Sequence, residues 1–355
     1  MKKINIAIVG CGAISYVTFP GYLKHPSSEI YALCDPLPER ARGAAKSIGI
    51  DPIIYSNYED VLNDSKIDAV ELLTPTHLHP QQSIDALNAG KHVSTQKPIG
   101  PKVSDADAVG KVANNSAAMF RVTENFLYYP PLIKAKKLIE SGSIGELSSI
   151  RMRTFLGKLD PNSLITPTED AMKWRGNPKD NPGGLLYDSG WHKFATAIWI
   201  AGEAESVSAI ISETDDFYLE APAAVIWKHK NQNCIGILES VYASEMKIRG
   251  KYYPVDDFFE FQGSKGSIWV TRSTGEMYDL PPVMLFKGNE THSFNVPSDW
   301  LEGFNGAAGA FIDSIIEGKQ ELMDAEMAKH TLQLTLAPYL SSNSKTHVNP
   351  STILD

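Results

Sequence analysis

Three short segments, far apart in the chain, carry side chains suited to moving a proton and a hydride. They are Gly10-Cys11-Gly12-Ala13-Ile14-Ser15, Gln96-Lys97-Pro98 and Asp188-Ser189-Gly190-Trp191-His192. The first follows an apolar run, where glycines let backbone amides approach the pyrophosphate of a dinucleotide. The other two supply a cation, a carboxylate and an imidazole, which a nicotinamide cofactor needs beside it for proton transfer. Together these segments predict an NAD(P)-dependent dehydrogenase.

Lys97, Asp188 and His192 are the candidate catalytic residues. Lys97 lies between an expected strand and Pro98, where it can donate to a substrate oxygen beside a cationic nicotinamide. Asp188 and His192 are four residues apart, so a helix over residues 185–199 would place them on one face. A carboxylate there would raise the basicity of the imidazole and fix its orientation. A solvated surface lysine and an ordinary pair within a helix are the alternatives.

The predicted cofactor loop connects a strand to a helix. The residues expected to face the pyrophosphate are Gly10, Gly12, Ala13 and Ile14. Ser15 replaces the third glycine of the fingerprint and is small enough for close packing of the helical stretch Ala13–Leu23. Asp35 ends the next strand, where a carboxylate accepts hydrogen bonds from the ribose and repels a 2′-phosphate. We therefore expect NAD rather than NADP, although Arg40 lies nearby, and a simple strand–turn–helix corner is the alternative.

Two further strand ends carry candidate crevice residues. Thr74-Pro75 ends one strand and Lys97-Pro98 follows another, so these residues are expected to line the cofactor site. Equally, Thr-Pro can merely terminate a strand. His77 and His79 suggest a metal site, but no third ligand is recognisable nearby. We therefore expect both histidines to be structural and no metal to be bound.

The elements that position these residues alternate between strand and helix. Apolar, β-branched runs predict strands at Ile4–Val9, Ile30–Cys34, Ala69–Leu73, His92–Thr95 and Met119–Thr123. Amphipathic stretches predict helices at Leu37–Ile48, Gln81–Ala89 and Ser104–Asn115. This alternation predicts an α/β fold with a doubly wound parallel sheet covered on both faces.

After residue 125 the pattern changes to longer alternating stretches joined by polar turns. Strands are expected at Leu147–Leu156, Val207–Glu213, Ala223–His229, Cys234–Tyr242, Phe258–Gln262 and Ser267–Thr271. They predict an antiparallel sheet. Helices are expected at Leu132–Glu140, Ala307–Ile316 and Ala325–Ala337. The polar segment 159–184 is expected to be a loop at the cleft.

Composition excludes several classes of function. The 355 residues suffice for two domains, and 43% hydrophobic with 21% charged residues is typical of globular proteins. The net charge of −9 argues against a nucleic-acid partner. Cys11, Cys34 and Cys234 have no metal-binding spacing, which predicts buried free thiols in a reducing compartment. No stretch has the length of a membrane span or the pattern of a cleaved leader, so we expect a cytoplasmic protein without a membrane partner.

The order of the motifs resembles that of the Gfo/Idh/MocA oxidoreductases, which include glucose–fructose oxidoreductase and inositol dehydrogenases. The motifs are the Gly10/Gly12 fingerprint, Thr74-Pro75 with His79, Ala89-Gly90-Lys91-His92-Val93 before Lys97-Pro98, Ser141-Gly142-x-Ile144-Gly145, Gly183-Gly184 and Asp188-x-Gly190-x-His192. This family usually has Glu before the Lys-Pro pair, whereas this chain has Gln96. The charge partner of Lys97 is therefore left open.

The resemblance implies an NAD(P)-binding Rossmann domain over residues 1–125. It also implies an α+β substrate-binding domain over residues 126–355, built on a large, mainly antiparallel sheet. Pairing of the open sheet faces would then make homodimers or homotetramers. The reaction it implies is hydride transfer between nicotinamide and a secondary alcohol of a sugar or cyclitol. Lys97 matches the catalytic lysine of the family, and Asp188 and His192 match its acid–base pair. Further substrate contacts are expected from Asn125 and Tyr128, which follow the last expected strand of the parallel sheet, and from Trp174 and Arg175 in the segment 159–184. Packing or a solvated loop is the alternative for all four.

Two other functions stay open. An NAD-dependent glycosidase would oxidise its substrate transiently to labilise a glycosidic bond and would regenerate the cofactor. A dinucleotide-binding sensor would catalyse nothing and would not need a lysine, a carboxylate and an imidazole together. A metal-dependent hydrolase is disfavoured because the sequence lacks a ligand cluster.

Overall fold

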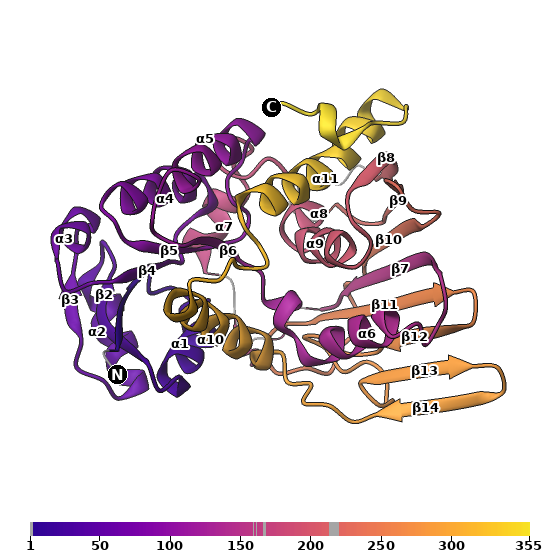
Figure 1. Cartoon of the computed structure of the whole chain (residues 1–355), viewed down its shortest axis with the longest axis horizontal. Helices are drawn as coiled ribbons and strands as arrows, with labels where there is room; N and C mark the ends of the chain where they lie inside the picture. The colour runs from indigo at the N-terminus through magenta and orange to yellow at the C-terminus, as the bar shows by residue number, and fades with distance from the viewer. Residues whose placement is uncertain (1–2, 159, 161, 166–167, 213–219) are drawn as a thin grey trace.

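Two β-sheets organise the chain, an N-terminal one and a C-terminal one (Figure 1). The computed structural model describes residues 3–158, 160, 162–165, 168–212 and 220–355. None of the helices in these ranges is long and apolar enough to cross a membrane. All three cysteines are buried and unpaired, as expected.

The N-terminal sheet has six parallel strands in the order β3-β2-β1-β4-β5-β6. Its strands are β1 Ile4–Val9, β2 Ser28–Cys34, β3 Ile53–Tyr55, β4 Ala69–Leu72, β5 His92–Gln96 and β6 Phe120–Thr123. Between them lie α1 Ser15–Lys24, α2 Pro38–Ile48, α3 Tyr58–Asn63, η1 Thr76–Leu78, α4 His79–Asn88 and α5 Val103–Ala113. This strand order defines the Rossmann arrangement and confirms the predicted doubly wound sheet. Within this sheet only β3 is absent from the predicted strands, because three residues are too few to show a periodicity.

The C-terminal sheet has eight strands in the order β14-β13-β12-β11-β7-β10-β9-β8. Its strands are β7 Leu147–Leu156, β8 Ala204–Ile211, β9 Ala223–His229, β10 Ile235–Tyr242, β11 Val255–Gly263, β12 Gly266–Val270, β13 Val283–Lys287 and β14 Glu290–Phe294. Every pairing is antiparallel except β7 with β10, which confirms the mainly antiparallel sheet. The predicted strand end at Glu213 lies outside the described residues.

Helices cover one face of this second sheet, on the side of the Rossmann sheet (Figure 1). The remaining helices are η2 Asn125–Tyr128, α6 Pro130–Glu140, α7 Glu169–Arg175, α8 Leu185–Asp188, α9 Gly190–Ala201, α10 Leu301–Glu317, α11 Ala325–Ser344 and η3 Pro350–Thr352. Alternate burial along β9 reflects this one-sided covering. The segment expected to be a loop contains α7, and the helix expected over residues 185–199 is divided at Ser189 into α8 and α9.

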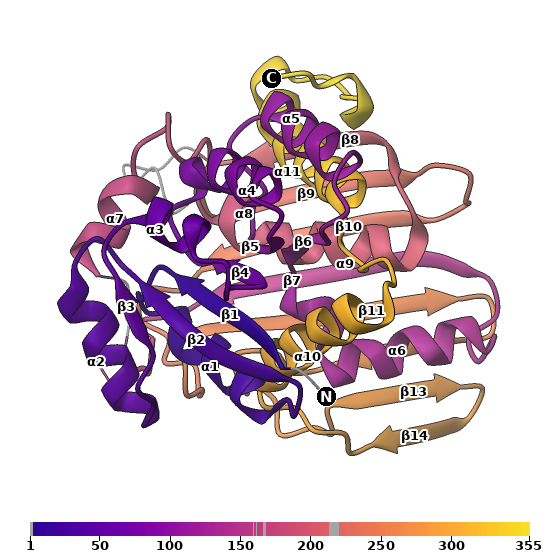
Figure 2. The ribbon, with the colours of Figure 1, turned by 60° about the vertical axis from the view of Figure 1, so that its left-hand side comes forward.

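The chain returns to the N-terminal sheet near its end. Figures 1 and 2 both place α10 beside α1. At Gly21 the two helices are so close that an added Cβ would lie 2.6 Å from the Cβ of Ala308. Phe311 and Ile312 complete the apolar core formed by α1, β1 and β2. The N-terminal sheet is therefore packed by residues from both ends of the sequence.

Candidate active site

The glycine loop has the backbone geometry that a dinucleotide phosphate requires. Gly10 has φ of +94°, and a Cβ there would lie 2.7 Å from the carbonyl oxygen of Leu73. A Cβ on Gly12 would meet no atom within 4 Å, so open space adjoins this residue. The N–H groups of Gly12, Ala13 and Ile14 precede α1 and donate to no group in the described part of the chain. Such orphan donors at a helix N-terminus fit a pyrophosphate.

Asp35 fixes the position of this loop. Its carboxylate accepts the backbone N–H of Cys11 at 3.0 Å and that of Leu37 at 2.9 Å. The carboxylate therefore lies at the carboxyl end of β2, where a ribose would be held, and it retains lone pairs for hydroxyl donors.

His79 connects two of the predicted crevice segments. The ring is buried, with Nδ1 2.7 Å from the carbonyl oxygen of Pro98 and Nε2 2.7 Å from that of Thr74. Burial lowers the pKa of His79 to about 4. The Thr74-Pro75 end of β4 is thus held against the segment that carries Lys97. His77 lies apart, with Nδ1 3.8 Å from a carboxylate oxygen of Asp180.

Lys97 and Asp188 lie together, although they are distant in sequence. The Lys97 ammonium contacts the Asp188 carboxylate in a short ion pair and donates to the Asp188 backbone oxygen at 2.8 Å. Arg175 Nε approaches the other carboxylate oxygen of Asp188 at 3.2 Å. Gln96 accepts the backbone N–H of Lys97 at 3.1 Å. The charge partner of the lysine is therefore Asp188.

His192 has a different carboxylate from the one expected. Its Nδ1 lies 2.7 and 2.9 Å from the two carboxylate oxygens of Glu124, and no hydrogen bond joins the ring to Asp188. Asp188 contacts Lys97 and Arg175 instead. Glu124 follows β6 directly, and the strand-end argument that selected its neighbour Asn125 applies equally to it.

A second buried ion pair lies behind His192. Lys193 Nζ is 2.7 Å from a carboxylate oxygen of Asp257, which also accepts hydroxyl hydrogen bonds from Thr154 and Ser273. Burial lowers the pKa of His192, Glu124 opposes this effect, and the positive charges of Lys97 and Lys193 add to it. His192 is therefore neutral at physiological pH. Nothing in the sequence pattern distinguishes Lys193 from a surface lysine.

The four further substrate candidates divide into two groups. Arg175 joins the Lys97–Asp188 pair, and its guanidinium lies 4.2 Å from the ring centre of Trp174. Asn125 is buried against Gly303 of α10, and Tyr128 donates to Glu321. The structure therefore brings Arg175 and Trp174 to the catalytic candidates, whereas Asn125 and Tyr128 pack against the C-terminal segment.

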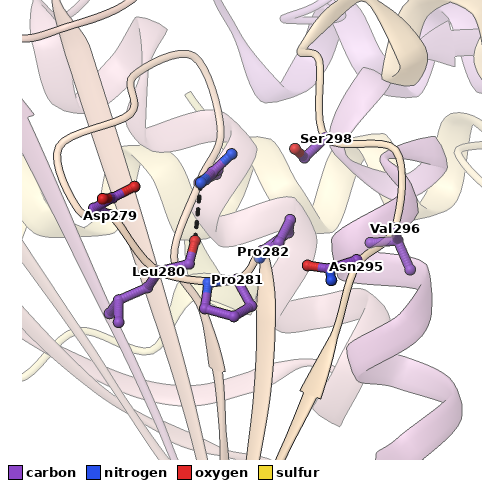
Figure 3. A pocket seen from close by; sticks show the side chains of 8 residues that line it. Asp279, Leu280, Pro281, Pro282, Asn295, Val296 and Ser298 are labelled. Carbon is purple, nitrogen blue, oxygen red and sulfur yellow. Dashed lines mark hydrogen bonds between the residues drawn. The ribbon is translucent and has the colours of Figure 1, made fainter.

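The pocket in Figure 3 is formed by residues other than those of this cluster. This pocket, of about 390 Å³, lies in the loops that follow β12 and β14 and contains none of the predicted site residues. In it the Arg272 guanidinium donates to the Leu280 carbonyl oxygen at 2.9 Å. Nowhere in the described ranges do three His, Cys, Asp or Glu side chains gather as metal ligands would.

Comparison with protein families now defines the class. The family model for the oxidoreductase family with an NAD-binding Rossmann fold matches residues 4–124, and that for the GFO/IDH/MocA C-terminal domain matches residues 132–269. The chain therefore belongs to the GFO/IDH/MocA oxidoreductases, and residues 4–124 form an NAD(P)-binding Rossmann domain.

Individual relatives agree with this assignment. An uncharacterised protein of Saccharomyces cerevisiae, YMR315W, is 27% identical over 85% of this chain and 86% of its own length. Levoglucosan dehydrogenase of Pseudarthrobacter phenanthrenivorans is 28% identical over 60% of this chain and 55% of its own. An oxidoreductase of Thermotoga maritima superposes with a TM-score of 0.80 at 28% identity, covering 99% of both chains. A levoglucosan dehydrogenase complex with NADH and levoglucosan shares the fold, with a TM-score of 0.82 at 21% identity over 98% of this chain and 99% of that one.

Proposed function

We propose that this protein is an NAD-dependent dehydrogenase that oxidises a secondary alcohol of a sugar or cyclitol. The observation that carries the proposal is the grouping of Lys97 with Asp188 and His192, which come from two separate segments of the chain, into one cluster. A protein that only senses a dinucleotide has no need of such a cluster.

The residues around the glycine loop fit the cofactor. The orphan amides of Gly12, Ala13 and Ile14 would hold the pyrophosphate, and Asp35 would hold the adenosine ribose. Bound nicotinamide would supply the hydride acceptor. The negative charge of Asp35 favours NAD because it would repel the additional phosphate of NADP.

The chain's own residues would handle the proton. The neutral imidazole of His192 would take the hydroxyl proton of the substrate as the hydride leaves the adjacent carbon. Lys97 would donate to the same oxygen and stabilise the negative charge that develops on it. Asp188, which contacts both Lys97 and Arg175, would hold these two cations at the substrate.

The substrate class rests on side-chain chemistry and on the relatives. Arg175 offers a planar fork for paired oxygens, and the indole of Trp174 can stack on the apolar face of a sugar ring. The levoglucosan complex of one structural relative, and the putative myo-inositol dehydrogenase of Sinorhizobium meliloti among the others, concern a sugar and a cyclitol. The combination of Asn125, Tyr128, Trp174 and Arg175 is not a phosphate-binding signature, so we favour an unactivated sugar over a nucleotide sugar.

We also propose a homodimer or homotetramer built through the second sheet. The face away from the helices carries Ile210, Ile226 and Ile235 on the adjacent strands β8, β9 and β10, and these are 77%, 51% and 45% exposed. Neighbouring exposed isoleucines of this kind mark an interaction surface.

The proposed activity is tested by incubating the protein with NAD or NADP and a panel of sugars, cyclitols and glycosides. The readouts are the absorbance of reduced nicotinamide and the identity of the products. Reduction of NAD with one class of sugar is the expected result. Cleavage of a glycoside without net reduction would instead identify the redox-assisted glycosidase. Cofactor binding without turnover across the panel would favour the sensor.

Replacing His192 tests its assignment as the base. General acid–base catalysis contributes about 10²–10⁴-fold, so His192→Ala is expected to lose turnover by at least the lower factor while NAD affinity is retained. His292→Ala, at an exposed position on β14, is the matched control and should keep full activity. Near-normal turnover in His192→Ala would refute the assignment.

A further inference from the structure

Glu124 presents its carboxylate to a single nitrogen of the His192 ring. Both of its oxygens lie within 2.9 Å of Nδ1, and the Glu124 side chain is completely buried. One oxygen also accepts the backbone N–H of Phe126 at 3.0 Å, which ties the carboxylate to η2. The position of the acceptor is therefore set by the backbone that follows β6.

The plane of the imidazole is fixed as well. The Phe126 ring stacks on His192 with ring centres 4.4 Å apart and planes within 16°. The other nitrogen, Nε2, has no hydrogen-bond partner in the part of the chain that the structure describes, and 7% of the residue is exposed. Nε2 is thus the ring atom left to meet a substrate.

We propose that Glu124 holds His192 in the tautomer with the proton on Nδ1, so that Nε2 carries the lone pair that accepts the substrate proton. An ionised carboxylate only accepts hydrogen bonds, so the nitrogen beside it must be the donor. A neutral imidazole carries one proton, so Nε2 is then unprotonated. Glu124 is in this sense a positioning residue, and its role rests on the proposed function of His192 as the base.

Among the residues that the structure describes, Glu124 is the carboxylate that hydrogen-bonds the His192 ring. Asp188 is committed to Lys97 and Arg175, and Asp257 is committed to Lys193. The charges that act on the imidazole are Glu124 from the end of β6, Lys97 from the end of β5 and Lys193 from α9. Of these three groups, Glu124 raises the pKa of His192 and the two lysines lower it.

Nitrogen-15 NMR of the histidine rings tests the proposal without any substrate. The full-length protein is labelled at histidine, and the His192 signals are assigned from their loss in His192→Gln. In the native protein at neutral pH, Nδ1 is expected to show the protonated shift and Nε2 the unprotonated one. In Glu124→Gln the amide can donate as well as accept, so the signals should move toward a mixture or toward the Nε2-protonated form. The pKa of His192 should also fall, because the Glu124 carboxylate that raises it is gone.

Two control variants separate this effect from a general disturbance. Glu71→Gln alters another fully buried carboxylate of the Rossmann domain, which bonds Tyr22 and Thr123, and should leave the His192 signals unchanged. Glu124→Asp keeps the charge and should retain the Nδ1-protonated form. If Glu124→Gln does not fold, as judged by circular dichroism, the native and Glu124→Asp spectra decide the question.

The proposal is overturned if native His192 carries its proton on Nε2, or if Glu124→Gln leaves both shifts unchanged. Failure of the proposed dehydrogenase function would look different, because turnover would be missing from the substrate panel while the tautomer remained as described. With an active substrate, Glu124→Gln should lower kcat more than it changes KM, since Glu124 acts on the base and not on the bound substrate.

Discussion

At the scale of the residue, His79 shows how the two crevice segments are held together. Its two ring nitrogens face two carbonyl oxygens, those of Thr74 and Pro98, so both acceptors would be satisfied only by a doubly protonated ring. Burial instead lowers the pKa of His79 to about 4, so the ring is neutral at physiological pH. One carbonyl oxygen then accepts a hydrogen bond from the ring, and the other does not. The residue is structural, and it supports the segment that presents Lys97.

The burial of His79 predicts a loss of stability in mild acid. Its folded-state pKa of about 4 lies below the ordinary 6.5, so between these values the unfolded chain binds the proton more readily. The stability that depends on His79 being neutral is fully present above the ordinary pKa. It is lost as pH falls toward the folded-state pKa. Urea unfolding should show a loss of roughly 2 kcal/mol between about pH 7 and about pH 5 from this group. His79→Gln should show a correspondingly smaller difference, and an equal pH dependence in both proteins would contradict the account.

At the scale of the element, the segment α8–α9 carries most of the catalytic candidates and begins at a carboxylate. Glu220 accepts the backbone N–H groups of Gly184 at 2.8 Å and Leu186 at 3.2 Å, and the hydroxyl of Tyr339 at 2.7 Å. A negative charge at the start of a helical segment satisfies orphan donors and is favoured by the peptide dipoles. This interaction holds the first turn, from which Asp188 reaches Lys97.

Glu220→Gln tests the importance of this carboxylate. A glutamine offers one acceptor and places an amide against a backbone donor, so the free energy of unfolding should fall by about 1–3 kcal/mol. Chemical denaturation measures the change. Glu245→Gln, at an exposed position, is the control and should be neutral. Unchanged stability in Glu220→Gln would show that the carboxylate does not hold the turn.

At the scale of the whole molecule, residues near the C-terminal end of the chain pack against the N-terminal Rossmann sheet. Arg121 on β6 lies 4.7 Å from the ring centre of Phe311 and 3.5 Å from a carboxylate oxygen of Glu321, so the C-terminal segment is bound to the Rossmann sheet. The second sheet, in contrast, exposes the isoleucines of β8, β9 and β10 on its open face. The proposed assembly would bury that face and leave the crevice clear.

Charge placed on the open face should dissociate the assembly. Ile210→Asp with Ile226→Asp would bury two carboxylates against apolar side chains, which weakens association by at least about tenfold. Size-exclusion chromatography with light scattering should then find a smaller species than the native protein forms. Leu354→Asp changes an equally exposed apolar residue, 76% accessible, away from this face and should not alter the mass. A native protein that is monomeric at all concentrations would refute the proposed oligomer.

The sequence by itself determined the class of the protein, because the relevant signals are local. Apolar runs before Gly10 and before Lys97 predicted strands of the parallel sheet, and the structure confirms that sheet. Hydrophobic periodicity did not predict two strands of the C-terminal sheet. The strand β14 is mostly polar and exposed, so it shows no apolar alternation. The strand β13 is apolar and alternately buried, yet it is also missing from the predicted strands.

Only the tertiary structure decided which side chains meet. Sequence spacing suggested Asp188 as the partner of His192, yet that position is occupied by Glu124, which is 68 residues away along the chain. Asp188 instead contacts Lys97, 91 residues away. A backbone pattern repeats over a few residues and can be read locally, whereas a contact between charged groups depends on how separate strand ends and helix starts are brought together by packing. The chemistry was therefore predictable as a set of residues, and the pairing within that set was not.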